Sequence, residues 1–516
     1  MNDSAEVRPT RTRRAGTLIT MVISLVIAAG CSGSASPAAT AAGTAIAAAS
    51  TASASTTANT TGTTASGSTA SGGGPGGAPA GGPGGAPGGA PAGGPGGAPG
   101  GAPAGGSSST ALASTATGAD SQAGGTASKT GETYTATNAD ESGVLASSGA
   151  TLTLTNATVA TSGNTSSSDN SSFAGLNAGV LATGVSTITM SGGTISTTGT
   201  GANGGFASGT GSSLTLENVT ITATADGGHG VMATQAGTVT VTGGSMTTSG
   251  AHGAPLATDR GGGTVTATGG TYVANGTDSP GIYSTGSITV SGGTFTEKAS
   301  ENIVIEGANS ATVTDTTMTS GSDKSGVMIY QSMSGDATGS QGTVTLSGGS
   351  LATTSTSAPA FYATNSTGVI SLTNVKVTEA SGVLVEAAAG SWGTSGSNGG
   401  TARLTASGEV LTGDVVADSI STVALSLANG STLTGAINAD KAAKSTGLTL
   451  DGTSSWTVTA DSHLTALAGA VVSGTSITNI TGTGHTVTYD ATASANAYLN
   501  GATYTLVGGG TLAPAA

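Results

Sequence analysis

Two histidines and two aspartates are the residues of this chain best suited to chemistry. Asp226 lies three residues before His229. His229 and His252 each lie two residues before the first expected inward residue of adjacent repeats, Val231 and Ala254, so we expect the two histidines to stack about 4.8 Å apart. Asp278 lies at nearly the same place further along the chain. Imidazole and carboxylate groups are common metal ligands, so these four residues form a candidate weak metal or ligand site. The alternative interpretation is that they are solvated turn residues, and we expect no cofactor and no resident metal.

The acidic residues do not form the pattern of a hydrolytic centre. Glycoside hydrolysis needs two carboxylates placed across the scissile bond, but no two aspartates of this chain are adjacent. Asp259 and Arg260 are adjacent residues of opposite charge, but the other motifs of a hydrolytic centre do not accompany them. We therefore expect that the protein is not an enzyme.

The charge of the chain argues against a nucleic-acid partner. The formal net charge is −14, and only 12 of 516 residues are Lys or Arg. Nucleic-acid binding needs a basic patch, whereas the basic residues beyond residue 31 are scattered. Aromatic residues are only 3% of the chain, so we expect a core of thin Val, Ile, Leu and Ala layers.

Residues 1–31 have the order of a secretion signal. Four arginines precede the apolar run 18–27, and small residues then lead to Cys31, the single cysteine of the chain. The run is too short to span a bilayer comfortably. The ending Ala-Ala-Gly-Cys resembles a bacterial lipobox, which implies acylation of Cys31 and attachment to a membrane. Cleavage without acylation, an uncleaved anchor helix and a twin-arginine signal stay open.

Residues 32–130 are expected to be a disordered stalk. Within them the tract 72–106 repeats Gly-Gly-Ala-Pro and Ala-Gly-Gly-Pro, and no side chain in it is larger than Ala or Pro. Nothing in such a tract offsets the conformational entropy lost on ordering. The stalk would hold a folded head away from its anchor.

From about residue 131 an internal repeat predicts a parallel β-helix. Each unit contains a Gly-apolar phrase, an alternating Thr-x-Thr strand, a Gly-Gly or Asn turn and a third short strand. Alternation places Val, Ile and Leu inward and Thr and Ser outward, and stacked coils bury a continuous column. Well-preserved phrases begin at Gly143, Gly179, Gly230, Gly281, Gly326 and Gly382.

The repeated part divides at about residue 400. Residues 131–400 have longer, irregular coils with loop insertions at 163–176 and 331–341. Residues 401–512 have tighter coils and an expected cap, because 411–418 recurs as 433–440. Residues 131–512 would hold about 15 coils. A β-sandwich is the structural alternative.

The Gly-apolar phrases, Thr-x-Thr strands and Ser-Gly-Gly-Thr turns resemble the right-handed β-helix passengers of bacterial adhesins and autotransporters, within the pectin-lyase-like superfamily. The resemblance implies an all-β, right-handed parallel β-helix. Gly228-His229-Gly230 matches the Gly-His-Gly of polygalacturonases, but their other motifs are absent. The chain shows no autotransporter membrane barrel, so we expect anchoring through Cys31.

Three functions follow as hypotheses. The first is a non-catalytic, lipid-anchored cell-surface adhesin that binds an unknown extracellular ligand, such as a glycan, a matrix protein or a cell surface. The second is a polysaccharide lyase or glycoside hydrolase. The third is ice binding by outward Thr arrays, although Thr is also favoured in strands for its propensity alone.

Overall fold

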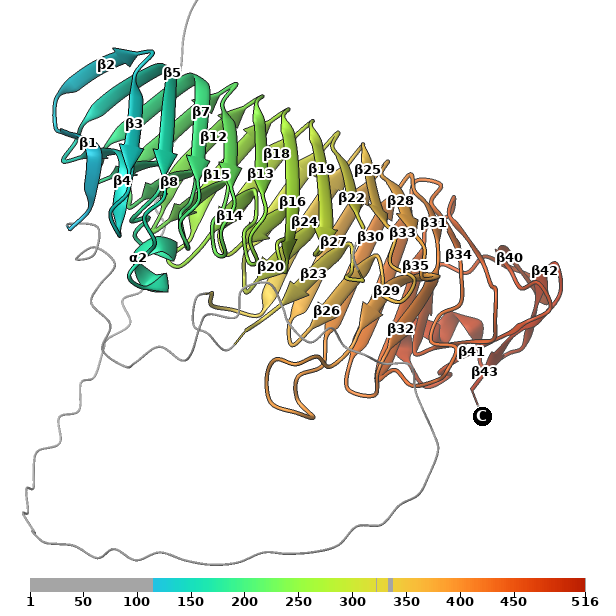
Figure 1. The fold of residues 1–516 in the computed structure, drawn as a ribbon. Helices are drawn as coiled ribbons and strands as arrows, with labels where there is room; N and C mark the ends of the chain where they lie inside the picture. Colours follow the sequence, from blue (N-terminus) through green and yellow to red (C-terminus); the bar gives the residue numbers. More distant parts are fainter. Residues whose placement is uncertain (1–114, 322, 333–336, 516) are drawn as a thin grey trace, which may run out of the picture. The chain divides into compact units, whose positions relative to one another are not determined.

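The computed structural model describes residues 115–515, apart from 322 and 333–336. The expected signal segment, Cys31 and residues 32–114 of the expected stalk lie outside this range. From Thr117 onward the chain forms a parallel β-solenoid of about 16 turns (Figure 1), which confirms the predicted all-β, parallel β-helix fold.

Sheet A runs along one side of the rod and contains twelve parallel strands. Each strand pairs with its counterpart in the next coil, in the order of the sequence. Its strands are β1 (Thr117–Ala123), β4 (Glu141–Ser147), β6 (Val180–Thr183), β8 (Gly205–Ser208), β11 (Val231–Thr234), β14 (Leu256–Thr258), β17 (Ile282–Ser284), β20 (Ile303–Glu306), β23 (Val327–Tyr330), β26 (Phe361–Thr364), β29 (Val383–Ala387) and β32 (Asp414–Ala417).

The second strand of each coil belongs to a ladder that we call B1. These strands carry the Thr-x-Thr alternation, with every second side chain buried. Ladder B1 contains β2 (Thr126–Thr130), β5 (Thr151–Thr161), β7 (Thr187–Thr197), β9 (Ser213–Glu217), β12 (Gly237–Thr242), β15 (Gly263–Thr268), β18 (Ser287–Ser291), β21 (Ser310–Thr314), β24 (Gln341–Ser347), β27 (Thr367–Thr373), β30 (Thr401–Ser407), β33 (Thr422–Ala428), β35 (Ser445–Leu450) and β38 (Ala466–Ala468).

The third strand of each coil belongs to ladder B2, which joins B1 in one sheet because β5 and β7 are long enough to run through both ladders. Its other strands are β3 (Thr133–Ala136), β10 (Thr220–Ala223), β13 (Ser245–Thr248), β16 (Thr271–Thr277), β19 (Thr294–Ala299), β22 (Thr317–Ser320), β25 (Ser350–Thr353) and β28 (Lys376–Glu379).

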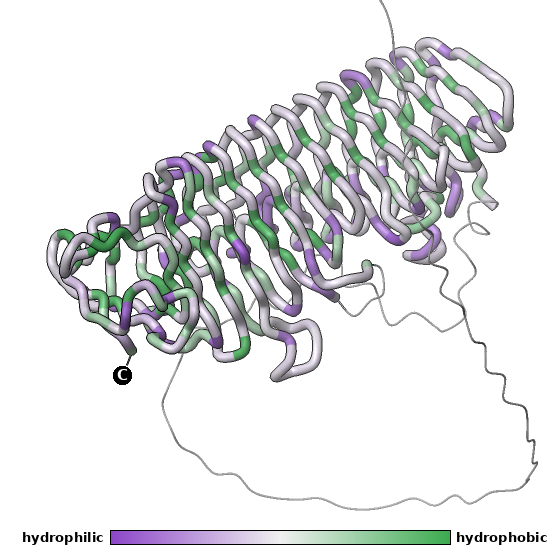
Figure 2. The backbone as a smooth tube through the Cα atoms, turned by 180° about the vertical axis from the view of Figure 1, so that it is seen from behind, coloured by the Kyte–Doolittle hydropathy of each residue, from purple (hydrophilic) through white to green (hydrophobic). Residues whose placement is uncertain are grey.

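The interior of the rod is a column of stacked aliphatic residues, which Figure 2 shows as apolar positions recurring from coil to coil. Val239 of β12, for example, lies between Leu214 and Val265 of the adjacent coils and is fully buried. Tyr272 and Phe295 stack within the column with ring centroids 4.3 Å apart. The predicted inward placement of Val, Ile and Leu is confirmed.

At four places the turn between B1 and B2 combines an Asn or Asp in one coil with a glycine in the next. Asn218 has a φ of 53° and Gly243, which follows it in the ladder, has a φ of 64°. A Cβ on Gly243 would lie 2.4 Å from the Asn218 Oδ1. The glycine is therefore required both for its positive φ and for the space that the asparagine side chain takes.

A second apolar cluster packs on the outer side of sheet A. It includes Leu181, Phe206 and Met232, which point away from the interior column. The insertion at 163–178, with the short helix α2 (Ser168–Ser172), supplies Ala174 and Leu176 to this cluster. α2 is a short segment in which the Ser167 side chain caps the N-terminus by accepting a hydrogen bond from the Asn170 amide.

The rod begins earlier than residue 131, which corrects the expected stalk boundary. β1 and β2 lie within the range assigned to the stalk and pair with β4 and β5. Here Asp120 and Lys129 take positions opposite Val144 and Leu154, and they form an ion pair of 2.5 Å. The boundary was hard to predict because polar residues replace the apolar ones at this end.

The C-terminal coils close with a third sheet, sheet C, which contains antiparallel pairs. Leu411 pairs with Leu433, so the recurrence of 411–418 as 433–440 marks consecutive coils. Sheet C contains β31 (Val410–Thr412), β34 (Thr432–Thr434), β36 (Ser455–Thr457), β37 (Ser462–Leu464), β39 (Val472–Ser473), β40 (Ser476–Thr481), β41 (Thr486–Tyr489), β42 (Tyr504–Val507) and β43 (Thr511–Pro514), and a 3-10 helix covers Ser494–Leu499.

Candidate functional site

The structure does not stack His229 on His252. Val231 pairs with Leu256, so the residue opposite His229 is Ala254, two residues beyond His252. The prediction was wrong because Leu256, and not Ala254, is the first inward residue of its coil. Ala254 instead packs in the outer cluster of sheet A.

His229 is held by backbone groups on both sides. Its amide donates to the Asn203 Oδ1, and its Nδ1 accepts a hydrogen bond of 3.0 Å from the Ala254 amide. Burial lowers the pKa of His229 to about 4. The neutral ring with an accepting Nδ1 carries its proton on Nε2, so neither nitrogen of this tautomer offers a lone pair to a metal.

The other three predicted residues serve the same turn in neighbouring coils. His252 is exposed and shares a positive-φ corner with Gly227 and Asp278, as the hydrogen bonds from Gly227 to Ala251 and from His252 to Thr277 show. Asp226 accepts a hydrogen bond from the Ala251 amide. Asp278 pairs with Lys324 at 3.0 Å. Within residues 115–515, as far as they are described, no three His, Cys, Asp or Glu side chains are grouped to hold a metal.

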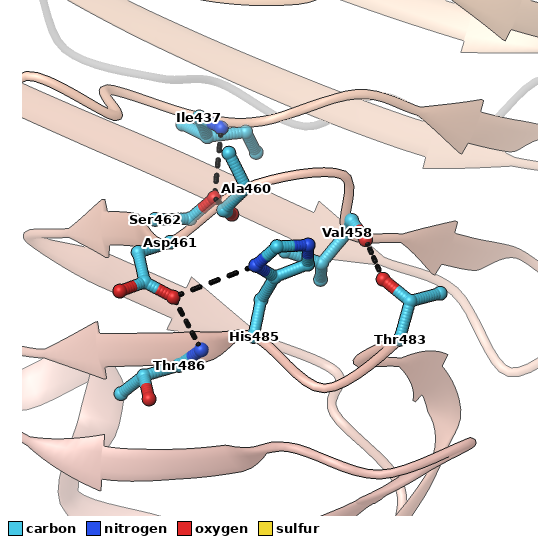
Figure 3. A network of polar contacts seen from close by, with 8 residues as sticks. All are labelled: Ile437, Val458, Ala460, Asp461, Ser462, Thr483, His485 and Thr486. Atoms are coloured by element: carbon cyan, nitrogen blue, oxygen red, sulfur yellow. Dashed lines mark hydrogen bonds and ion pairs between the residues drawn. The ribbon is translucent and has the colours of Figure 1, made fainter.

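A second histidine–carboxylate contact lies near the C-terminal end (Figure 3). The His485 Nδ1 is 3.7 Å from the Asp461 Oδ1, which also accepts a hydrogen bond from the Thr486 amide. Ser462 follows Asp461 in the chain, but its Oγ accepts from the Ile437 amide and donates to the Ala460 carbonyl. Because Ser462 is fully buried and turned away from His485, the three residues do not form a nucleophilic triad.

Sequence reasoning missed a line of polar and aromatic residues on the outer side of sheet A. In the early coils the outward position is apolar, as at Phe206 and Met232. From β17 onward the same row contains Tyr283, Val304, Met328, Tyr362 and Glu386. We call the part of the outer face from β17 to β29, with its flanking turns, the sheet A strip.

The centre of the sheet A strip is the carboxyl group of Glu306. Its Oε2 accepts hydrogen bonds from the Tyr283 hydroxyl at 2.6 Å and from the Tyr330 hydroxyl at 2.9 Å, and its Oε1 accepts one from Ser332. Burial raises the pKa values of Tyr283 and Tyr330 well above the ordinary range, and the nearby Glu306 raises both further. The two phenols are therefore donors at neutral pH.

Turns and insertions place further side chains beside the outer face of sheet A. After β14 the Arg260 guanidinium lies 3.8 Å from the centre of the Phe173 ring of the insertion at 163–178. The Trp392 ring, from the loop after β29, packs against Tyr330 of β23, with centroids 4.7 Å apart. Of the residues on this face, the sequence analysis singled out only Asp259 and Arg260. The tyrosines were missed because tyrosine is common in β-strands.

The outward side of ladder B1 presents rows of hydroxyl groups. The central row is unbroken over thirteen coils, and no described residue forms a hydrogen bond with any of its hydroxyls. Every member is at least partly exposed. Its members are Ser128, Thr153, Thr189, Thr215, Thr240, Thr266, Thr289, Thr312, Thr345, Ser371, Thr405, Ser426 and Thr449.

Comparisons with known proteins find no matching family model, no similar curated protein and no similar solved structure. Among the described residues, no helix has the length and hydropathy needed to cross a membrane. The fold and the side-chain geometry are therefore the basis for a functional proposal.

Proposed function

We propose that the protein is a non-catalytic surface rod that binds an extracellular ligand through the hydroxyl face of ladder B1 and is tethered to a bacterial membrane by a lipid on Cys31. The unbroken central row supports this proposal. Its hydroxyls repeat at about 4.8 Å along the rod and are not used within the fold. Such a row can make many weak contacts with an extended ligand, and their sum gives adhesion by multivalency.

The arrangement of the acidic and histidine residues also favours binding over catalysis. His229 is neutral and fully engaged, and Asp226 caps a backbone amide. The Glu306 carboxyl accepts three hydroxyl donors in a buried position. None of these groups has the pairing with a second exposed carboxyl that glycoside hydrolysis uses.

The experiment for the binding face is retention of the full chain on immobilised glycans, matrix proteins and whole cells. Replacing Thr240, Thr266 and Thr289 together by Lys should lower retention clearly, because three long charged side chains interrupt the central row. The matched control replaces Thr222, Thr247 and Thr296 of ladder B2 by Lys and should retain binding. Equal retention by both variants would refute the hydroxyl face as the binding surface.

The tether is tested separately. Cys31→Ala should move the chain from the membrane fraction to the medium, because a lipid anchor needs the thiol for acylation. Cys31→Ser is the conservative control and should behave in the same way. Retention of either variant in the membrane fraction would refute the lipid anchor while leaving the binding face unaffected.

Ice binding is a second candidate for the same face, and the strict register favours it. The central row has neither a charged nor an aromatic side chain, so a soluble glycan would gain little ion-pair or stacking energy there. A rigid lattice of Thr hydroxyls and methyls suits a ligand that is itself a lattice. Exclusion of the full chain from a slowly growing ice front would contradict this candidate, whereas enrichment in the ice would support it.

A further inference from the structure

One ion pair of the rod joins two coils that are not neighbours. Asp278 lies in the turn after β16 and Lys324 in the turn after β22, with the coil of β19 between them. The Lys324 Nζ is 3.0 Å from the Asp278 Oδ1, and the two side chains are only 14% and 13% exposed. The lysine therefore reaches across a whole coil to meet this carboxyl group at a site from which water is largely excluded.

The coil between them places a second carboxyl group beside the pair. The Asp278 amide donates to the Ala299 carbonyl, so Ser300 and Glu301 follow at the same corner in the next coil. Glu301 is 1% exposed, and its Oε2 accepts a hydrogen bond of 2.8 Å from the Ser300 Oγ. Burial raises the pKa of Glu301, and both Lys324 and Asp278 are close enough to act on that pKa. Glu301 is thus a buried acid next to an amine and a carboxyl group.

A covalent bond would remove the cost of burying the ion pair. The desolvation of two charges can exceed their mutual attraction, whereas an amide at the same place has no charge. The fold also holds the Lys324 nitrogen beside the Asp278 carboxyl group, so the entropy cost of bringing amine and acid together is met by folding. A neighbouring acid that gives and takes protons is the remaining requirement for amide formation, and Glu301 supplies it.

We propose that Lys324 and Asp278 condense to an intramolecular isopeptide bond, a modification that ties three consecutive coils together. A proton first passes from the ammonium to the carboxylate within the pair. The Lys324 Nζ lone pair then attacks the Asp278 Cγ, so that the Nζ–Cγ bond forms and one C–O bond of the carboxyl group breaks. Glu301 gives a proton to the leaving hydroxyl, which departs as water, and takes up the proton that Nζ loses.

The ion pair of Asp120 and Lys129 in the first coil is a matched control within the same chain. Its contact of 2.5 Å is the shorter one, but the two side chains are 26% and 23% exposed. Among the described residues of that coil no carboxyl group is buried, so no shielded acid is at hand to transfer protons. We expect this pair to stay ionic, and trypsin should cleave normally after Lys129.

Mass spectrometry of tryptic peptides from the purified and then unfolded full chain detects the bond. Trypsin cleaves after free lysine, so an amide at Lys324 blocks cleavage there. We expect a branched peptide in which residues 261–298 are joined to residues 299–376, with a mass lower than the sum of the two by one water. Recovery of the separate peptides 299–324 and 325–376 in place of the branched peptide would overturn the proposal.

Three variants separate the role of the amine from that of the acid. Lys324→Arg keeps the positive charge but not the nucleophilic amine, so the branched peptide should be lost. Glu301→Gln keeps the ion pair but removes the proton carrier, and the yield should fall at least about tenfold. Glu297→Gln is the matched control, because Glu297 is a buried acid of the same coil that accepts from Asn302, and it should keep the yield. An equal yield in the two Gln variants would overturn the assignment of proton transfer to Glu301.

The bond does not depend on the hydroxyl face or on the lipid anchor. The Lys variants of the central row and Cys31→Ala should therefore give the branched peptide in full yield, whatever ligand the rod binds. Because the bond closes a loop from residue 278 to residue 324 in the unfolded chain, the natural chain should melt at a higher temperature than Lys324→Arg. A natural chain that contains the branched peptide but melts with Lys324→Arg would contradict the bond as a tie between coils.

Discussion

The two outward sides of the rod, over sheet A and over ladder B1, show different uses of the same coil. Over ladder B1 the outward residues are mostly Thr and Ser in contact with solvent, with a few exceptions such as Glu217 and Arg403. Over sheet A the outward residues are mostly apolar or aromatic and form a second buried cluster, with the carboxyl of Glu306 among them. Parallel strands buried on both faces have continuous apolar sequences, whereas strands with one solvated face alternate. The solenoid thus has a repetitive solvated face over ladder B1. Over sheet A it has a buried face, on which the residue type differs from coil to coil.

The comparison is sharpest with three aspartate substitutions in one coil. Val239→Asp and Met232→Asp should both lower the free energy of unfolding by about 3 kcal/mol or more, because each buries an unpaired charge. Val239 points into the interior column, and Met232 points into the outer cluster. Thr240→Asp, on the solvated side, should change it by less than about 0.5 kcal/mol. Urea unfolding followed by circular dichroism checks all three, and a mild Met232→Asp would show that the outer cluster is not a true core.

A pH effect of similar size should come from His229, at the turn that leads into sheet A. Its pKa is lowered to about 4 from 6.5, so the fold prefers the neutral ring. The unfolded chain therefore takes up the proton first, and stability is lost as the pH falls from about 6.5 to about 4, by roughly 3 kcal/mol.

The measurement for His229 is the melting temperature as a function of pH. His229→Gln should remove this part of the pH dependence, and His252→Gln, at an exposed position, should keep it. The buried Glu297 acts in the opposite sense, because burial raises its pKa and the fold then prefers the protonated acid. Subtracting the melting temperatures of each variant from those of the natural chain at each pH isolates the contribution of the histidine. If the pH dependence of the melting temperature were unchanged in His229→Gln, His229 would not be a buried neutral ring.

A smaller effect concerns the hydrogen bonds to Glu306. Tyr330→Phe removes a hydroxyl that donates to a buried carboxyl oxygen, and it should cost about 1 to 3 kcal/mol. Tyr134→Phe is the matched control, because the Tyr134 hydroxyl has no hydrogen-bond partner among the described residues. The urea midpoints of the two variants give the comparison. Equal midpoints would mean that the Glu306 cluster adds nothing to the covered face.

The smallest effect lies at the turn beside the solvated face. Gly243 and Gly269 both have a φ of 64°, but only the first faces an Asn side chain, at Asn218. Alanine at either position should cost about 1 kcal/mol for its positive φ, and Gly243→Ala should cost about 1 kcal/mol more for the contact with Asn218. In an Asn218→Ala background the two substitutions should become equal, which melting temperatures can verify. A persistent difference would contradict the role of Asn218.

Much of the fold followed from local pattern. Thr-x-Thr alternation in 238–242 placed Val239 and Val241 inward, and Asn and Gly-Gly pairs located the turn between B1 and B2. The early coils were missed because Asp120 and Lys129 break that pattern at the end of the rod. The relative position of His229 and His252 was predicted wrongly because the apolar segments of these two coils can be aligned in two ways. The prediction aligned Val231 with Ala254, whereas in the structure Val231 pairs with Leu256.

The sequence by itself determined the β-solenoid, the inward residues of ladder B1 and the hydroxyl row, because all three depend on a period of two repeated in every coil. Only the tertiary structure decided the environment of His229, the covering of sheet A by the insertion at 163–178, and the meeting of Tyr283, Glu306 and Tyr330. These features depend on the register between coils and on which turns fold back over the strands. A single sequence contains no periodic signal for either, since each of these contacts occurs once.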